Sequence, residues 1–200
     1  AAVIYGLSFY LISLTLAFFV AIPCLAACLM TIALATLYSA RLKRKGSYGN
    51  VCFGLLVAAC ILIGATAGGN VSALVIAVMA IATLVHASDN IIGTFPDMDA
   101  DIKMGFQTLP TQRGLKSAAR IAFFLISAAS GSAMFLWLLG LNRLYLPLAI
   151  IACFSLLWTT FSVFKDPVRF SSLGALWVLY SYFMEEILLY MSFILGAIGE

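Results

Sequence analysis

Charge is scarce in this sequence. Aspartate, glutamate, lysine and arginine make up 10% of its 200 residues, whereas soluble domains carry about 25%. Hydrophobic residues account for 64%, and the mean hydropathy is +1.12. A soluble fold would leave much of this apolar surface in water. The composition therefore excludes a soluble globular domain and indicates a polytopic membrane protein.

Other patterns are also missing. Apolar stretches such as LISLTLAFFVAIPCLAACLMTIALAT lack the period-2 alternation of transmembrane strands, so we predict helical spans. The five cysteines form no CxxC pair, and we interpret them as small buried hydrophobic side chains. Phosphate-binding GxxxxGK[ST], nucleophile-elbow and HExxH motifs do not occur. No nucleic-acid partner is expected.

The apolar runs predict an all-α, polytopic transmembrane helical bundle that forms a single domain over residues 1–200. Pro23 fits the start of a helix, and Gly68-Gly69-Asn70 fits a turn between two spans. The seven predicted spans are approximately 2–20, 22–40, 48–66, 71–92, 116–139, 144–164 and 172–198.

The basic residues predict the orientation of these spans. If each span crosses the membrane once, ten of the eleven lysines and arginines lie on one side, and only Arg143 lies on the other. By the positive-inside rule, that side is the cytoplasmic face of the cell membrane. The ten are Arg41, Lys43, Arg44, Lys45, Lys103, Arg113, Lys116, Arg120, Lys165 and Arg169.

The stretch FPDMDADIKMGFQTLP, residues 95–110, holds three of the eight acidic residues. Pro96 fits a helix start, where the helix dipole favours acids. Asp97 and Asp101, four residues apart, would share a face, while Asp99 points elsewhere. Two such carboxylates repel unless a cation or a proton lies between them. Mg²⁺ suits the pair, because it binds one or two carboxylates and completes its shell with substrate phosphate oxygens.

Cations near this stretch would suit a diphosphate ester. Lys103 and the basic cluster 41–45 could bind its oxygens. The alternative is that the three acids are simply solvated loop charges. A calcium-binding EF-hand loop is excluded, because Ile102 replaces its glycine and Thr108 its final glutamate.

These residues resemble a known family. DMDADIKMG, followed by TLP and Gly114, resembles the second aspartate-rich motif of UbiA-type intramembrane prenyltransferases. The stretch YSARLKR (38–44), with Gly49-Asn50, resembles the tyrosine-and-lysine loop of that family. The resemblance implies a nine-helix bundle, of which the seven spans would be the third to ninth. The family's first aspartate-rich motif does not occur in this sequence, so we expect two further helices and that motif upstream.

The resemblance also implies an activity, the Mg²⁺-dependent transfer of an isoprenyl group from its diphosphate to a lipophilic acceptor. The stretch from Leu42 onward most resembles archaeal ether-lipid members, whereas TFPDMDADIKMGFQTLP lacks an arginine-glutamate pair of that group and resembles carotenoid- or pigment-type members equally well. Geranylgeranyl diphosphate is the expected donor. By resemblance, Asp97 and Asp101 are the catalytic metal-binding carboxylates, with a weaker role for Asp99. The expected diphosphate contacts are Lys103, Lys43, Arg41 and Tyr38, and the weaker acceptor contacts are Asn90, Asp89 and His86.

Alternatives remain for several polar residues. A lone histidine in the position of His86 is more often a hydrogen-bonded packing residue than an acceptor contact, and Asp89 could equally be a capping or solvated side chain. Glu185 and Glu186 fall midway along the last apolar run, where ionisable groups usually face a partner or a cavity. A seven-helix transporter would use these two glutamates, and a non-catalytic relative of the prenyltransferases is a further alternative.

Overall fold

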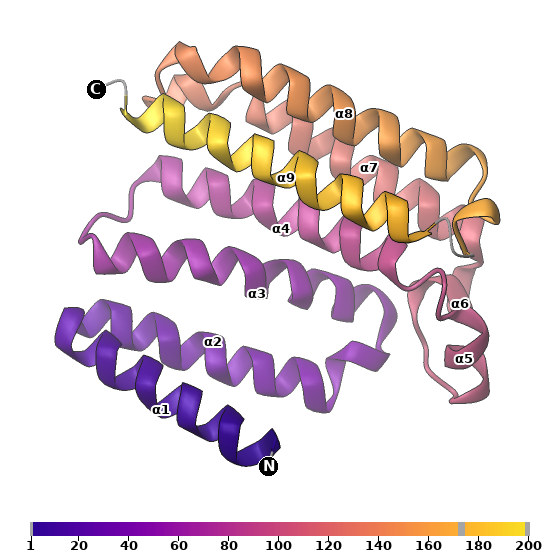
Figure 1. The fold of residues 1–200 in the computed structure, drawn as a ribbon, viewed down its shortest axis with the longest axis horizontal. Helices are drawn as coiled ribbons and strands as arrows, with labels where there is room; N and C mark the ends of the chain where they lie inside the picture. The colour runs from indigo at the N-terminus through magenta and orange to yellow at the C-terminus, as the bar shows by residue number, and fades with distance from the viewer. Residues whose placement is uncertain (1, 172–174, 199–200) are drawn as a thin grey trace.

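The computed structural model describes residues 2–171 and 175–198, and within them it is a bundle of helices (Figure 1). Seven long helices are α1 (Ala2–Val20), α2 (Ile22–Ala40), α3 (Gly46–Ala67), α4 (Ala73–Gly93), α7 (Leu115–Ala133), α8 (Leu146–Lys165) and α9 (Ala175–Ile198). Short helices are α5 (Met98–Lys103) and α6 (Leu109–Arg113), together with the 3₁₀ turns η1 (Leu42–Arg44), η2 (Leu136–Leu139), η3 (Arg143–Tyr145) and η4 (Arg169–Ser171). The predicted all-α class is confirmed.

The long helices follow the predicted spans to within a few residues, except that α7 ends at Ala133 and a 3₁₀ turn follows. The predicted residues 172–174 lie outside the described part. Among the described residues, five segments are long and apolar enough to cross a membrane: Ile22–Ala40, Gly46–Ala67, Ala73–Gly93, Arg143–Lys165 and Val178–Ala197. Gly6–Val20 is a shorter apolar helix. The chain is an integral membrane protein, and its number of crossings stays a prediction.

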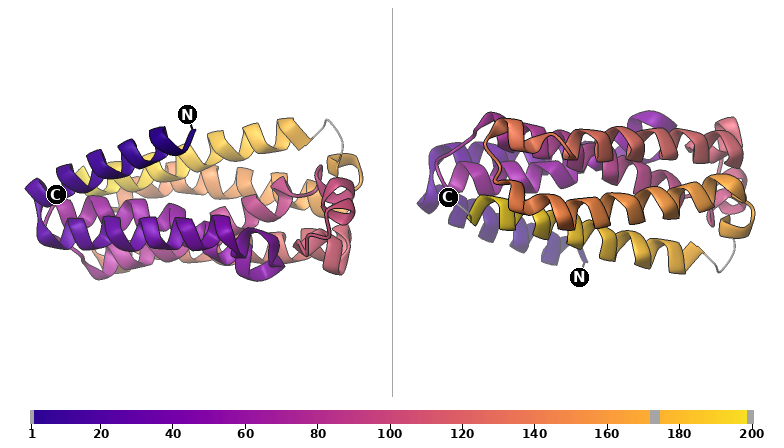
Figure 2. Two further views of the ribbon diagram at one scale, coloured as in Figure 1. Left: turned by 90° about the horizontal axis from the view of Figure 1, so that it is seen from below. Right: turned by 90° about the horizontal axis from the view of Figure 1, so that it is seen from above.

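Helices that follow one another in the chain pack side by side, from α1 through α4 to α7, α8 and α9. The last helix also returns to contact α4, which places α4 between α3, α7 and α9 (Figures 1 and 2). The main core is formed by α4, α7, α8 and α9, with residues such as Ile81, Ile126, Leu156 and Leu189. A second, smaller cluster joins α1 to α2 around Ala17, Cys24 and Cys28. The position of α4 thus brings its polar residues against three neighbours.

Small residues set the contact between α3 and α4. A Cβ atom on Gly54 would collide with the backbone carbonyl oxygen of Thr83 on α4. Close approach of this kind is how apolar helices associate in a membrane, where no hydrophobic effect drives them together. The glycine therefore fixes the spacing of the two helices that carry Asn50 and Asn90.

The connections with the most charge lie at one end of the bundle. Figure 1 shows the α2–α3 connection, α5, α6 and the end of α8 at that end, and the α3–α4 turn at the opposite end. Nine of the ten residues predicted to face the cytoplasm lie in these connections or in the first or last turn of the adjoining helices, and Arg120 lies in the second turn of α7. The grouping agrees with the predicted topology, while the side of the membrane that this end faces stays a prediction.

Candidate functional site

A cavity of about 290 Å³ opens at this charged end of the bundle. It lies between the end of α2, η1, the start of α3, the end of α4 and the α4–α6 connection. Its lining residues are Tyr38, Lys43, Gly46, Asn50, Asn90, Thr94, Asp97, Ala100, Asp101, Met104, Phe106 and Thr108. Five of the residues predicted from the sequence are therefore brought together in one place.

The acidic stretch is held by apolar anchors on both sides. Phe95 precedes α5 and Leu109 begins α6, and both side chains are buried in the main core. Between them α5 makes one and a half turns, in which the Asp101 N–H donates to the Asp97 carbonyl oxygen at 2.8 Å. The buried anchors leave the polar face of this short helix free to line the cavity.

The aspartates of α5 differ in position. Asp97 and Asp101 both line the cavity, as their spacing of one helical turn predicts, whereas Asp99 is exposed and is not part of the lining. Asp101 is 7% exposed, and Asp97 is open to solvent. The structure thus places two carboxylates, one buried and one accessible, on the same cavity.

The cations also separate into two groups. Lys43 of η1 and Tyr38, near the end of α2, line the cavity opposite α5. Arg41 and Lys103 are exposed and are not among its lining residues. Lys43 is therefore the predicted cation that the structure brings to the carboxylates.

The basic and acidic loops are joined directly. The Gln107 N–H donates to the Arg44 carbonyl oxygen at 3.2 Å, and the Arg44 guanidinium stacks over the Phe106 ring at 4.6 Å. Gly46 has a φ of +45°, and a Cβ there would lie 2.7 Å from Gln112 Oε1. Only glycine adopts this conformation without strain, so the sequence GSYGN begins α3 where the two loops meet.

Asn50 is a lining residue to which the sequence predictions gave no role, although it belongs to the Gly49-Asn50 part of the matched motif. Its side-chain oxygen accepts a 2.7 Å hydrogen bond from Asn90 Nδ2, which joins α3 to α4 at the cavity wall. Thr94 is a second such residue, and its hydroxyl donates to the Ile91 carbonyl oxygen. An asparagine in an otherwise apolar helix was the available signal, because buried amides require partners.

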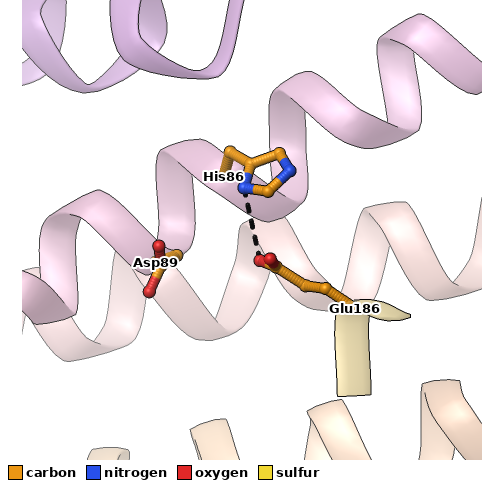
Figure 3. Close-up of side chains that lie close together, drawn as sticks. All are labelled: His86, Asp89 and Glu186. Atoms are coloured by element: carbon orange, nitrogen blue, oxygen red, sulfur yellow. Dashed lines mark ion pairs between the residues drawn. The ribbon is translucent and has the colours of Figure 1, made fainter. Parts of the chain in front are cut away.

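His86 and Asp89 are not among the residues that line this cavity. Instead they face α9, where the ligand atoms of His86, Asp89 and Glu186 lie within 4.8 Å of one another (Figure 3). His86 Nδ1 lies 3.4 Å from Glu186 Oε1, and His86 Nε2 lies 3.0 Å from the Tyr190 hydroxyl. The two polar regions therefore occupy successive turns of α4.

Glu185 points to a different neighbour. Its Oε1 accepts hydrogen bonds from Ser155 Oγ at 2.7 Å and Thr159 Oγ1 at 2.8 Å, both on α8. Adjacent glutamates of α9 thus contact different helices. The hydroxyl donors offset part of the cost of an ionisable group in an apolar bundle, while Glu185 Oε2 is buried without a hydrogen-bond partner.

The donor set of the cavity fits a hard divalent cation and an anionic ligand. Carboxylate oxygens of Asp97 and Asp101 and amide oxygens of the asparagines are the ligands that Mg²⁺ prefers. Lys43 supplies a positive charge for an anion held next to them. The fold and this cavity define a membrane-embedded site with oxygen ligands for a cation and a lysine for an anion.

The chain belongs to the UbiA prenyltransferase family, whose sequence model matches residues 1–172. A solved structure of digeranylgeranylglyceryl phosphate synthase in membranes superimposes with a TM-score of 0.81 and 25% identity, over 98% of this chain and 69% of that one. The recognised family and the UbiA-type fold are confirmed.

Curated relatives carry the same enzyme name. Digeranylgeranylglyceryl phosphate synthase of Pyrococcus abyssi is 37% identical over 122 residues, which are 60% of this chain and 43% of the relative. The Methanoregula boonei enzyme of that name is 29% identical over 68% of this chain and 50% of its own length. The Natronomonas pharaonis enzyme is 26% identical over 99% of this chain and 69% of its own length. The chain spans about half the length of the first two relatives.

Proposed function

We propose that this protein is a Mg²⁺-dependent intramembrane prenyltransferase that transfers a geranylgeranyl group from its diphosphate to a lipophilic acceptor. The observation that carries the proposal is the convergence of Asp97, Asp101 and Lys43 on one cavity at the end of an apolar bundle. Membership of the UbiA family supports it.

The relatives' names favour a particular acceptor. Digeranylgeranylglyceryl phosphate is a glyceryl phosphate that carries two geranylgeranyl chains, so the acceptor would be geranylgeranylglyceryl phosphate. In this reaction the allylic carbon–oxygen bond of the donor breaks and diphosphate leaves. The acceptor hydroxyl oxygen forms the new ether bond to the allylic carbon, and its proton is released.

The residues of the cavity have separate roles in this proposal. Asp97 and Asp101 would hold Mg²⁺, which would neutralise charge on the departing diphosphate. Lys43 would bind diphosphate oxygens from the opposite wall, and Tyr38 would donate a hydrogen bond beside it. The exposed Lys103, Arg41 and Asp99 would act on the local potential rather than by contact.

The surroundings would protect the reactive carbon. An allylic cation is captured by water, and the long apolar helices of the bundle would surround the prenyl chain and exclude water from it. Asn90 would be the acceptor contact nearest the diphosphate, because it lines the cavity, whereas His86 and Asp89 do not.

The topology belongs to the same proposal. The charged end of the bundle would face the cytoplasm, where a water-soluble diphosphate head group is accessible. The seven long helices would form one domain and correspond to the third to ninth helices of the family fold. The coverage of the superposition supports this correspondence.

The test is turnover by the purified full-length protein in lipid nanodiscs, supplied with geranylgeranyl diphosphate, geranylgeranylglyceryl phosphate and Mg²⁺. Mass spectrometry of the lipid product and release of diphosphate would be measured together. We expect Asp97→Asn and Asp101→Asn each to lower kcat by about a hundredfold or more, the usual scale for loss of electrostatic stabilisation. Asp99→Asn is the matched control and should stay within about twofold, as for an exposed charge.

Two outcomes would contradict the proposal. Equal effects of the three substitutions would remove the metal role of the cavity carboxylates. A wild-type protein that releases no diphosphate would be a non-catalytic relative. The transporter alternative finds no support in the comparisons, and uptake of labelled substrate into proteoliposomes without product would favour it.

A further inference from the structure

The group formed by His86, Asp89 and Glu186 lies outside the cavity assigned to diphosphate. His86 and Asp89 are three residues apart on α4, so they project from the same face, and Glu186 meets them from α9 (Figure 3). His86 and Glu186 are buried, and Asp89 is partly exposed. Three possible ligand atoms from two packed helices thus converge inside an apolar bundle.

The contacts of these side chains do not neutralise the charge of the buried Glu186 carboxylate. Within the described part of the chain, Glu186 forms an ion pair with His86, and Asp89 forms none. Glu186 is 7% exposed, and its Oε1 atom accepts no hydrogen bond. A protonated imidazole paired with a carboxylate makes a hydrogen bond of about 2.7–2.9 Å, whereas His86 Nδ1 lies 3.4 Å from that oxygen.

The distance of 3.4 Å between His86 Nδ1 and Glu186 Oε1 instead matches the separation of two ligand atoms bound to one metal ion. Ligand atoms at about 2.0–2.1 Å from a tetrahedral ion lie about 3.4 Å from each other. Asp89 completes the group within 4.8 Å and would close on the ion by a shift of about 1 Å. The spacing of His86 and Glu186 is therefore that of two ligands of one ion, and Asp89 would be drawn in as the third ligand on binding.

The other ring nitrogen supports this reading. His86 Nε2 lies 3.0 Å from the Tyr190 hydroxyl, and the two rings stack with centroids 6.2 Å apart. An Nε2–H that donates to Tyr190 leaves the Nδ1 lone pair facing the carboxylates. Metal-binding histidines are commonly oriented in this way by a partner on the second nitrogen.

We propose that His86 Nδ1 and the carboxylates of Asp89 and Glu186 form a binding site for a divalent transition-metal ion of the zinc type. One nitrogen and two carboxylate oxygens suit Zn²⁺ better than Mg²⁺, which prefers oxygen ligands alone. Two ionised carboxylates would be neutralised by the ion, which removes the cost of burying them. Asp89 precedes Asn90, a lining residue of the diphosphate cavity, so the ion would enter from that side.

The first experiment measures metal content. Protein carrying Asp97→Asn and Asp101→Asn, which removes the α5 carboxylates, would be purified in detergent, stripped with chelator and titrated with Zn²⁺ by calorimetry. We expect one Zn²⁺ per chain, with Mg²⁺ bound at least about a hundredfold more weakly. Absence of stoichiometric Zn²⁺ binding would overturn the proposal.

Matched substitutions on α9 locate the site. Glu186→Gln should weaken Zn²⁺ binding at least about tenfold, and Tyr190→Phe about tenfold through the orientation of His86. Glu185→Gln, one residue away and bonded to α8, should leave Zn²⁺ affinity unchanged. Equal affinities for Glu186→Gln and Glu185→Gln would refute the assignment, provided that both elute as folded protein.

A spectroscopic measurement separates this site from the cysteines. Co²⁺ would replace Zn²⁺ in the Asp97→Asn, Asp101→Asn protein, and its visible absorption would report a nitrogen and oxygen ligand field. A thiolate-to-cobalt charge-transfer band would instead place the ion on a cysteine, and would overturn the proposal. All these measurements are made without turnover, so their result is independent of the proposed prenyltransferase activity.

Discussion

Asn90 Nδ2 donates a hydrogen bond of 2.7 Å to Asn50 Oδ1 at the wall of the cavity. The bond joins α4 to α3 between two apolar surfaces, and Asn50 is only 6% exposed. Two side chains separated by 40 residues in the sequence are thus fixed relative to each other beside the site. The pair holds the acidic and basic walls of the cavity at a defined distance.

Replacing Asn50 by alanine should destabilise the bundle. The amide of Asn90 would lose its partner while it stays partly buried, at a cost of about 1 kcal/mol. Unfolding of the variant in mixed detergent micelles would measure the change. Asn70→Ala in the exposed α3–α4 turn is the control and should have a smaller effect. If neither Asn50→Ala nor Asn90→Ala lowers the stability, the bond makes no net contribution.

Alanine at position 54 should separate α3 from α4. The added Cβ would collide with the carbonyl oxygen of Thr83, and overpacking of this kind costs about 1–3 kcal/mol. Gly64→Ala on the same helix is the matched control, because nothing lies within 4 Å of its added methyl group. There we expect no loss, and a gain of up to about 1 kcal/mol from helix propensity. Similar stabilities of the two variants would contradict the close packing of α3 on α4.

A lysine that lines the cavity should contribute more to the affinity for geranylgeranyl diphosphate than a lysine outside it. Lys43→Ala should raise the KM for geranylgeranyl diphosphate at least about tenfold, because hydrogen bonds to charged groups contribute about 1.5–3 kcal/mol. Lys103→Ala should change KM by no more than about twofold, since Lys103 is exposed and is not a lining residue of the cavity. Steady-state kinetics at a fixed Mg²⁺ concentration would compare the KM values of the two variants. A larger effect of Lys103 would mean that the diphosphate binds outside the cavity.

Removing the hydroxyls that bind Glu185 should weaken the α8–α9 contact. The double change Ser155→Ala and Thr159→Val leaves a buried carboxylate without donors, which costs about 1–3 kcal/mol. Adding Glu185→Leu to this variant should recover part of the loss, since an apolar side chain needs no donor. Ser162→Ala on α8, a partly exposed residue whose hydroxyl bonds its own helix, is the control. No recovery by leucine would mean that the hydroxyls act through packing alone.

Much of the fold could be predicted from the sequence. Continuous apolar runs gave the long helices, and the spacing of Asp97 and Asp101 predicted their shared face. The end of α7 was missed by six residues, because Phe135 to Leu139 remain apolar after the α-helix ends at Ala133.

The site could be predicted only in part. Motif resemblance pointed to the two loops that meet at the cavity, but it could not separate Lys43, which lines the cavity, from Lys103, which does not, since that distinction depends on how η1 folds against α5. Asn50 was missed because its partner lies on the next helix. The glutamates of α9 were recognised as unusual, yet their partners depend on the packing of α9 between α4 and α8, which no local pattern encodes.

The two adjacent glutamates of α9 restrict the rotation of that helix about its own axis. Successive residues of an α-helix are turned by about 100°, so Glu185 and Glu186 can meet α8 and α4 at the same time in only one rotation of α9 about its axis. The leucines and phenylalanines of this helix would tolerate other rotations, because lipid and protein are equally apolar, whereas the hydrogen bond of Tyr190 to His86 favours the same one. The acidic pair thus selects one rotational orientation of the last helix, much as a single polar residue fixes the register of a coiled coil.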